Sequence, residues 1–159
     1  MQPTPMTAGA GETGRAADAD GGAIAVVESF LAAFAAQDLE RALALMADDI
    51  VYQNVPFPAD RGKKAVERTL AAFGKVVTGF EVKMLNIAAR DGVVLTERVD
   101  ILKGPLVYLD LPVCGTFQVR DGKIVLWRDY FDLMGATAKL LVSPIRWLLL
   151  RGRSESSGT

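Results

Sequence analysis

Residues 80–131 read FEVKMLNIAARDGVVLTERVDILKGPLVYLDLPVCGTFQVRDGKIVLWRDYF, and this stretch decides the fold class. Its apolar residues form four runs that are each long enough for a strand, at 80–90, 93–103, 106–119 and 123–131. Asp91-Gly92 separates the first two runs, and Asp121-Gly122 separates the last two. An Asp-Gly pair between apolar runs is the strongest short-range signal for a hairpin, so the stretch predicts an antiparallel meander.

The residues before this meander predict helices that cover it. Apolar residues recur at three- and four-residue spacing from Ile24 to Phe34, which indicates an amphipathic helix. Asp38 is a predicted N-cap for a short helix over 39–46, residues 50–55 are predicted to form a strand, and 62–77 a third helix. The expected fold class is α+β, with a curved antiparallel or mixed sheet that forms a cone, N-terminal helices on one face and a C-terminal apolar helix. Such a cone encloses a pocket suited to small apolar ligands.

The chain of 159 residues is long enough for one domain. Residues 1–22 are small, polar and rich in glycine, and we expect a disordered tail there. They lack the features of a secretory signal, which favours a cytoplasmic protein. We expect the cone-shaped domain over 23–133, a helical segment over 134–150 and a second disordered tail over 151–159.

The C-terminal segment carries basic residues and no acidic residue between 133 and 153. Lys139, Pro144 and Arg146 interrupt its apolar run, which argues against a membrane span. Two interpretations remain open. The segment forms a helix that covers the pocket or a dimer interface, or it rests on a membrane surface and collects lipophilic substrate.

Composition excludes several classes of chemistry. Eighteen basic residues against nineteen acidic ones give a net charge of -1, so nothing points to a nucleic-acid partner. The chain has no histidine, which excludes Ser-His-Asp and Cys-His nucleophiles and His-based metal sites. Cys114 is the single cysteine, and we expect it to be a small core residue. One cysteine also excludes a metal site of several thiolates, so catalysis would rest on carboxylates, Arg, Lys, Tyr and amides.

Strand periodicity groups the polar candidates by face. Tyr52 shares a face with Asn54, and Arg98 shares a face with Asp100. Asp129 lies among large apolar residues, so its carboxyl needs a partner or a proton. On the 93–103 strand, however, the opposite face is the more apolar one. Periodicity alone therefore predicts that Arg98 and Asp100 form a solvated pair.

Three motifs, YQN at 52–54, TERVD at 96–100 and WRDYFD at 127–132, resemble those of the limonene-1,2-epoxide hydrolase family. That family shares its cone fold with nuclear transport factor 2 and ketosteroid isomerase, and the resemblance covers about 24–133. It implies that Tyr52, Asn54, Arg98, Asp100 and Asp129 are catalytic and face inward. None of the five is substituted here.

The resemblance also implies a mechanism without a cofactor. Asp100 would protonate the epoxide oxygen, and Asp129 would act as base on a water that Tyr52 and Asn54 orient. Arg98 would bind both carboxylates. The product would be a diol, formed in one step with no covalent intermediate.

Position and strand parity suggest apolar residues that line the pocket, although each has a plain core role as the alternative: Phe34, Phe73, Val77, Leu102, Leu111, Val113 and Phe131. Residues 103–111 and the tail differ from limonene-specific members, and the tail resembles that of relatives that take bulkier lipophilic epoxides of sterol and fatty-acid types. The expected substrate is a lipophilic epoxide, and its type (terpene, fatty-acid or sterol) stays open. The resemblance further implies a homodimer. The alternatives are a ketosteroid-isomerase-like or polyketide-cyclase-like enzyme, or a non-catalytic small-ligand-binding domain, on the same fold.

Overall fold

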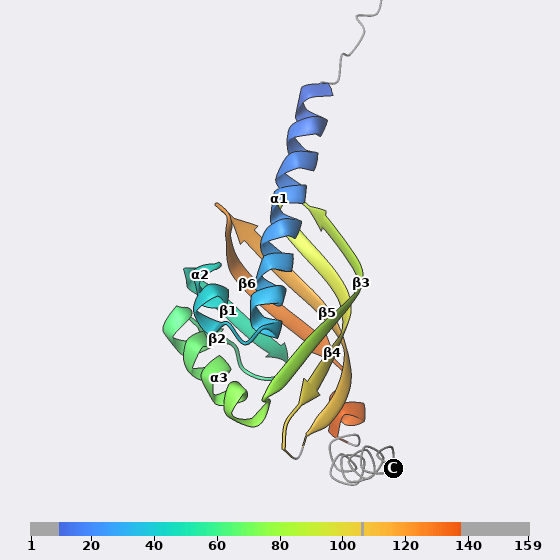
Figure 1. Ribbon diagram of the computed structural model, residues 1–159. Coiled ribbons are helices and arrows are strands. Elements are labelled where there is room, and N and C mark those ends of the chain that lie inside the picture. The colour runs from blue at the N-terminus through green and yellow to red at the C-terminus, as the bar shows by residue number, and fades with distance from the viewer. Residues whose placement is uncertain (1–9, 106, 138–159) are drawn as a thin grey trace, which may run out of the picture.

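The computed structural model describes residues 10–105 and 107–137, with side chains from Asp18 onward (Figure 1). Its elements, in chain order, are α1 (Ala10–Ala35), α2 (Leu39–Ala44), β1 (Met46–Val55), β2 (Asp60–Arg61), α3 (Lys63–Val76), β3 (Gly79–Arg90), β4 (Val93–Lys103), β5 (Tyr108–Arg120) and β6 (Lys123–Phe131). A short helical segment follows at 133–137.

The strands form one mixed sheet in the order β2-β1-β6-β5-β4-β3. β1 pairs with β6 in parallel, and every other neighbouring pair is antiparallel. Figure 1 shows the sheet curving around the helices, which gather on its inner side. The predicted α+β class and the N-terminal helical cover are confirmed.

Both predicted hairpin turns are confirmed by their backbone geometry. Asp91 and Gly92 have φ of 54° and 75°, and Asp121 and Gly122 have φ of 51° and 71°. Positive φ at both central residues is the requirement of the type I′ turn, whose twist matches that of the strands it joins. The two turns place β3, β4, β5 and β6 in the order that positions the site described below.

Aromatic rings pack α1 onto the inner face of the sheet. The ring centroid of Phe30 lies 4.9 Å from that of Trp127 and 6.1 Å from that of Phe117. All three side chains are buried. Asp38 caps α2 as predicted, since its carboxylate accepts a hydrogen bond from the backbone N–H of Arg41 at 3.1 Å. The core therefore lies between α1 and the sheet.

The predicted N-terminal tail is wrong for residues 10–22, because α1 already begins at Ala10. Alanines in this part favour the helix, and the carboxylate of Asp20 accepts a hydrogen bond from the backbone N–H of Gly92 at 3.1 Å. Residues 1–9 and 138–159 lie outside the described residues. The proposed helix over 134–150 is thus seen only as far as 137, and the membrane-surface interpretation and the tail over 151–159 stay predictions.

Among the residues that the structure describes, no helix is both long and apolar enough to cross a membrane. Cys114 is exposed, so its predicted core position is wrong. The alternation of β5 explains the error. Val113, Gly115 and Phe117 face the helices, and Cys114 between them faces outward.

Candidate active site

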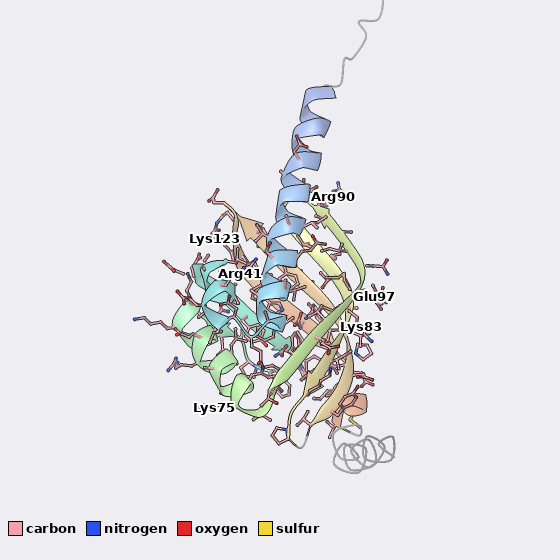
Figure 2. The ribbon with its side chains drawn as sticks, viewed as in Figure 1. Arg41, Lys75, Lys83, Arg90, Glu97 and Lys123 are labelled. Atoms are coloured by element: carbon pink, nitrogen blue, oxygen red, sulfur yellow. The ribbon has the colours of Figure 1, made fainter. Side chains whose placement is uncertain are left out.

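The two faces of β4 reverse the usual division between polar and apolar side chains. Thr96, Arg98 and Asp100 are buried on the inner face, whereas Leu95 on the outer face is 55% exposed. Figure 2 shows Glu97 of β4 and Lys83 of β3 projecting away from the helices. The solvated Arg98-Asp100 pair that periodicity predicts is therefore wrong, because burial follows the helical cover rather than the apolar count of each face.

Arg98 joins two aspartates beneath the helices. Its Nε donates to Asp100 Oδ1 at 2.9 Å, and its Nη2 donates to Asp129 Oδ2 at 2.7 Å. The guanidinium is 1% exposed, and both carboxylates are buried. Charge-assisted hydrogen bonds from the fixed guanidinium fork hold both acids in defined positions.

Two further residues make room for this cluster and orient it. Arg98 Nη1 donates to Thr96 Oγ1 at 3.0 Å, which engages the third nitrogen of the guanidinium. Gly115 lies between Thr96 and Asp129 in the sheet register. A Cβ at Gly115 would come within 2.6 Å of Thr96 Oγ1 and 2.9 Å of Asp129 Oδ1, and it would also collide with the guanidinium. The absence of a side chain at this position is thus a condition for the cluster.

One carboxylate oxygen of Asp129, the expected base, can still accept a hydrogen bond. Asp129 Oδ1 is buried and makes no hydrogen bond to the described residues. The indole N–H of Trp127 lies close enough to Asp129 to favour the ionised carboxylate, but it does not meet the geometry of a hydrogen bond. Beside them, Asn54 Nδ2 donates to the hydroxyl oxygen of Tyr52 at 2.6 Å. The phenol proton of Tyr52 and the amide oxygen of Asn54 are left to bind a further molecule.

Burial raises the pKa of both carboxyls. The pKa of Asp100 rises to about 6 because desolvation outweighs the attraction of Arg98, and desolvation likewise raises the pKa of Asp129 against the opposing effect of Arg98. Burial would lower the pKa of Arg98, but Asp129 and Asp100 together raise it. Burial and then Asp129 raise the pKa of Tyr52, which keeps the phenol protonated. One cation between two buried carboxyls favours a state with one proton shared by the pair.

The five polar side chains line one cavity of about 240 Å³ under α1 and α3. Six of the seven apolar residues that the sequence suggested also line it: Phe34, Phe73, Leu102, Leu111, Val113 and Phe131. Val77 does not, and lines a neighbouring cavity instead. Val77 is the C-cap of α3 and already has an extended backbone, so helical spacing does not fix its direction.

Sequence reasoning missed several residues that line this cavity: Leu31, Thr69, Leu70, Phe80 and Trp127. A signal existed for some of them. Leu70 lies one helical turn before Phe73, and Phe80 pairs in register with Leu102. Both residues could have been identified from the sequence by asking which neighbours share a helix face with Phe73 or a sheet face with Leu102.

Chemically, the cavity holds two carboxyls, Asp100 and Asp129, that bind the same guanidinium and have apolar walls around them. Such a pair can activate water and protonate a leaving oxygen in a single step, provided that one carboxyl is protonated and the other ionised. Among the described residues, no group of three or more Cys, Asp or Glu side chains is placed to hold a metal ion.

Comparison with known proteins is consistent across sequence and structure. The family profile of the limonene-1,2-epoxide hydrolase catalytic domain matches residues 21–141. Epoxide hydrolase EphG of Mycobacterium tuberculosis is 46% identical over 109 residues, which cover 67% of this chain and 71% of that protein.

Two solved structures extend the comparison. An epoxide hydrolase of M. tuberculosis similar to limonene-1,2-epoxide hydrolases superposes with a TM-score of 0.75 at 39% identity, covering 82% of this chain and 97% of that chain. A putative polyketide cyclase of Xanthomonas campestris pv. campestris gives a TM-score of 0.68 at 22% identity, covering 77% and 98%. The second likeness is informative about the fold alone.

Proposed function

Because the chain belongs to the limonene-1,2-epoxide hydrolase family and is an epoxide hydrolase, we propose that it adds water to a lipophilic epoxide in one step and releases a vicinal diol. The observation that supports this mechanism most strongly is that the two carboxylate oxygens of Asp129 have different surroundings. One carboxylate oxygen is held by Arg98, and the other is buried without a hydrogen bond to the described residues.

The unpaired oxygen of Asp129 is the base. A water between this oxygen, Tyr52 and Asn54 donates one proton to Asp129 Oδ1 and accepts from the phenol of Tyr52. The water oxygen forms a bond to one epoxide carbon as the bond from that carbon to the ring oxygen breaks. Asp100 gives its proton to the departing oxygen, so the diol forms without a covalent link to the protein.

Arg98 keeps the two carboxyls in different protonation states. With one proton on Asp100 and none on Asp129, the cluster is neutral overall, which a buried site favours. The step moves a proton onto Asp129 and removes one from Asp100, so the net charge does not change. Exchange of protons with solvent restores the starting state, and no cofactor is consumed.

The substrate end of the cavity is apolar. Leu102, Leu111, Val113 and Phe131 line it beside Asp100, and Leu111 lies opposite Asp100 in the sheet register. These walls bind hydrocarbon and exclude bulk water, which suits an epoxide with a lipophilic body.

A homodimer through the outer face of the sheet is part of the proposal. Leu95 and Tyr130 are exposed there, at 55% and 43%. The register places both on the face away from Arg98 and Asp129. A second copy would remove this apolar surface from water. Sedimentation velocity of wild type and Leu95→Glu tests it: we expect a dimer for the wild type and a monomer for the variant, whereas two monomers would overturn the dimer.

The test of the mechanism is diol formation from a terpene, a styrene-type, a long-chain and a sterol epoxide. We expect the wild type to produce diol from at least one of them, and Asp129→Asn to lose activity by at least about a hundredfold. Asp132→Asn, an exposed carboxylate on the same segment, is the matched control and should retain activity. Equal activity of Asp129→Asn and wild type would overturn the assignment of the base.

A further inference from the structure

Trp127 carries a buried hydrogen-bond donor that the mechanism above does not use. Its side chain is 3% exposed and lines the active-site cavity, and its indole N–H makes no hydrogen bond to the described residues. An indole N–H can only donate, and a buried donor without an acceptor costs free energy. An unsatisfied donor inside a reaction cavity therefore points to a role beyond packing.

An unsatisfied acceptor lies beside this donor. Asp129 is two residues further along β6, so both side chains are on the inner face of the strand. Asp129 Oδ1 is also buried without a hydrogen bond to the described residues. Burial raises the pKa of Asp129, and Arg98 and then the indole N–H of Trp127 oppose this rise. A small rotation of the carboxylate would pair the unsatisfied donor with the unsatisfied acceptor.

The rings around Trp127 fix the direction of its N–H. Its ring centroid lies 4.2 Å from that of Tyr52 and 4.9 Å from that of Phe30, and it stacks on Phe117 at 6.1 Å. An indole packed in this way cannot turn its N–H to solvent, so the donor stays beside Asp129 whether that carboxyl is charged or neutral. Because an N–H binds a carboxylate more strongly than a carboxylic acid, Trp127 favours the ionised form of Asp129.

Asp100 has no comparable second donor. Its Oδ1 accepts from Arg98 Nε at 2.9 Å, and no other side chain among the described residues donates to it. The sheet register places the apolar Leu111 opposite Asp100. The two carboxyls share one guanidinium but differ in the donors around them, so a single proton prefers Asp100.

The other ionisable groups that face Asp129 do not reverse this preference. Arg98 and Asp100 reach the cavity from β4, and Tyr52 reaches it from β1. Arg98 binds both carboxyls, and burial keeps Tyr52 protonated by raising its pKa. The described parts of α1 and α3 line the cavity with apolar side chains and one threonine, which do not titrate. The difference between the two carboxyls is therefore made at Trp127.

We propose that Trp127 is a positioning residue whose indole N–H donates to Asp129 Oδ1 and thereby places the single proton of the pair on Asp100. The inference rests on the proposed function, in which Asp129 is the base and Asp100 is the acid. Donation to the reacting water suits the reaction less well, because that water accepts from Tyr52 and needs its other lone pair for the epoxide carbon. An enzyme molecule with the proton on Asp129 has neither its base nor its acid.

The test locates the proton in the free protein. Labelling the aspartate carboxyls with the heavy carbon isotope gives one NMR signal for each carboxyl, and the position of a signal depends on protonation. Spectra of wild type and Trp127→Phe are recorded over a pH range around 6, the pKa of Asp100. The signals missing from Asp100→Asn and Asp129→Asn assign the two carboxyls.

In the wild type, we expect Asp100 to become protonated first as the pH falls, while Asp129 stays ionised. In Trp127→Phe the two carboxyls should titrate together, with the apparent pKa of Asp129 raised by about one to two pH units. At the pH optimum, kcat should fall about fivefold, because pH changes the number of protons on the pair and not their distribution. The inference is overturned if Trp127→Phe leaves both titration curves unchanged.

Two controls separate the N–H from the packing of the ring. A tryptophan analogue at position 127 with sulfur in place of the N–H keeps the shape of the ring and should titrate like Trp127→Phe. Phe30→Leu loosens the packing against Trp127 and keeps its N–H, so both carboxyls should titrate as in the wild type. An analogue that titrates like the wild type, or a Phe30→Leu variant that titrates like Trp127→Phe, would also overturn the inference.

Diol formation, measured in parallel, separates this inference from the proposed function. If no epoxide is hydrolysed but Trp127→Phe moves the proton from Asp100 toward Asp129, the mechanism fails and the role of Trp127 stands. If hydrolysis depends on Asp129 but wild type and Trp127→Phe titrate alike, the mechanism stands and the inference about Trp127 fails.

Discussion

The inner and outer faces of β4 differ in which side chains they bury and which they expose to solvent. On the inner face, Arg98 and Asp100 are buried with their charges. On the outer face, Leu95 is exposed to solvent although it is apolar. Burying a charge costs free energy and exposing leucine forgoes some, so this part of β4 stabilises the fold less than a wholly apolar inner face would. The inner face instead holds a guanidinium and a carboxyl where helices exclude water.

Glu97, on the outer face of β4, is exposed to solvent as charged residues usually are, in contrast to the buried charges of the inner face. Its carboxylate is exposed and accepts a hydrogen bond from Asn86 Nδ2 at 2.7 Å, a surface contact worth little to stability. Arg98, its neighbour in sequence, is the largest fully buried side chain among the described residues. The comparison predicts that equal chemical changes have unequal consequences on the two faces.

The largest difference should come from removing the buried cation. Arg98→Met leaves two buried carboxyls without their partner, and we expect the free energy of unfolding to fall by about 3–5 kcal/mol. Lys83→Met, on the outer face of the adjacent strand, should change it by less than about 0.5 kcal/mol. Urea unfolding monitored by circular dichroism measures both. Similar losses of unfolding free energy in the two variants would contradict the expectation that pairing within the buried cluster stabilises the fold more than a surface charge does.

The pH dependence of stability should be the next largest effect. The pKa of Asp100 is about 6 in the folded protein, above its ordinary 3.8, so the folded state binds this proton more tightly than the unfolded state. The resulting stabilisation is complete below pH 3.8 and is lost as pH rises through about 6. It amounts to about 3 kcal/mol.

Unfolding of wild type and Asp100→Asn at several pH values between these limits isolates this contribution. The stability advantage of the wild type should shrink as pH rises. An advantage that grows with pH would show that Asp100 is ionised throughout and would remove it as the acid. Glu97→Gln, on the outer face, should leave the pH profile unchanged.

Gly115→Ala should disrupt the cluster through a single methyl group. The new Cβ would lie 2.6 Å from Thr96 Oγ1 and would also press on the guanidinium, so Arg98 and Asp129 must shift. A displacement of about 1 Å lowers activity about a hundredfold. Cys114→Ala, at the neighbouring outward-facing position, is the control and should stay within about twofold. Steady-state hydrolysis rates compare the two, and equal rates would show that the site tolerates the displacement.

The smallest of these effects should follow from Thr96. Thr96→Val removes the acceptor of Arg98 Nη1 and keeps the shape of the side chain, so we expect kcat to fall about tenfold with KM unchanged. Thr96→Ser keeps the hydroxyl and should restore most of the activity. If Val and Ser variants have the same kcat, the hydroxyl has no positioning role.

Much of the fold follows from local patterns. The Asp-Gly pairs at 91–92 and 121–122 predicted the hairpins because only a few residue pairs adopt positive φ twice in succession. Helical spacing from Ile24 to Phe34 predicted α1, but its start at Ala10 was not predictable. The contact from Asp20 to Gly92 joins residues far apart in the chain, and local composition carries no information about it.

The candidate site was less accessible to pattern analysis. Periodicity assigned the wrong face of β4 to the core, since it counts apolar residues and cannot see which face the helices cover. Recognition of the three motifs supplied the inward orientation of Arg98 and Asp100. The space that Gly115 leaves depends on packing between elements and had no signal in the sequence.

A single-turnover reaction in water labelled with the heavy oxygen isotope tests the central claim, which is direct addition of water activated by Asp129. With enzyme in excess over epoxide, the diol is analysed by mass spectrometry after less than one cycle. Direct addition predicts that the first diol already carries the heavy oxygen from solvent and that the protein carries none. Unlabelled diol in the first turnover, with the label appearing in a carboxyl of the protein, would contradict the account and make an aspartate the nucleophile.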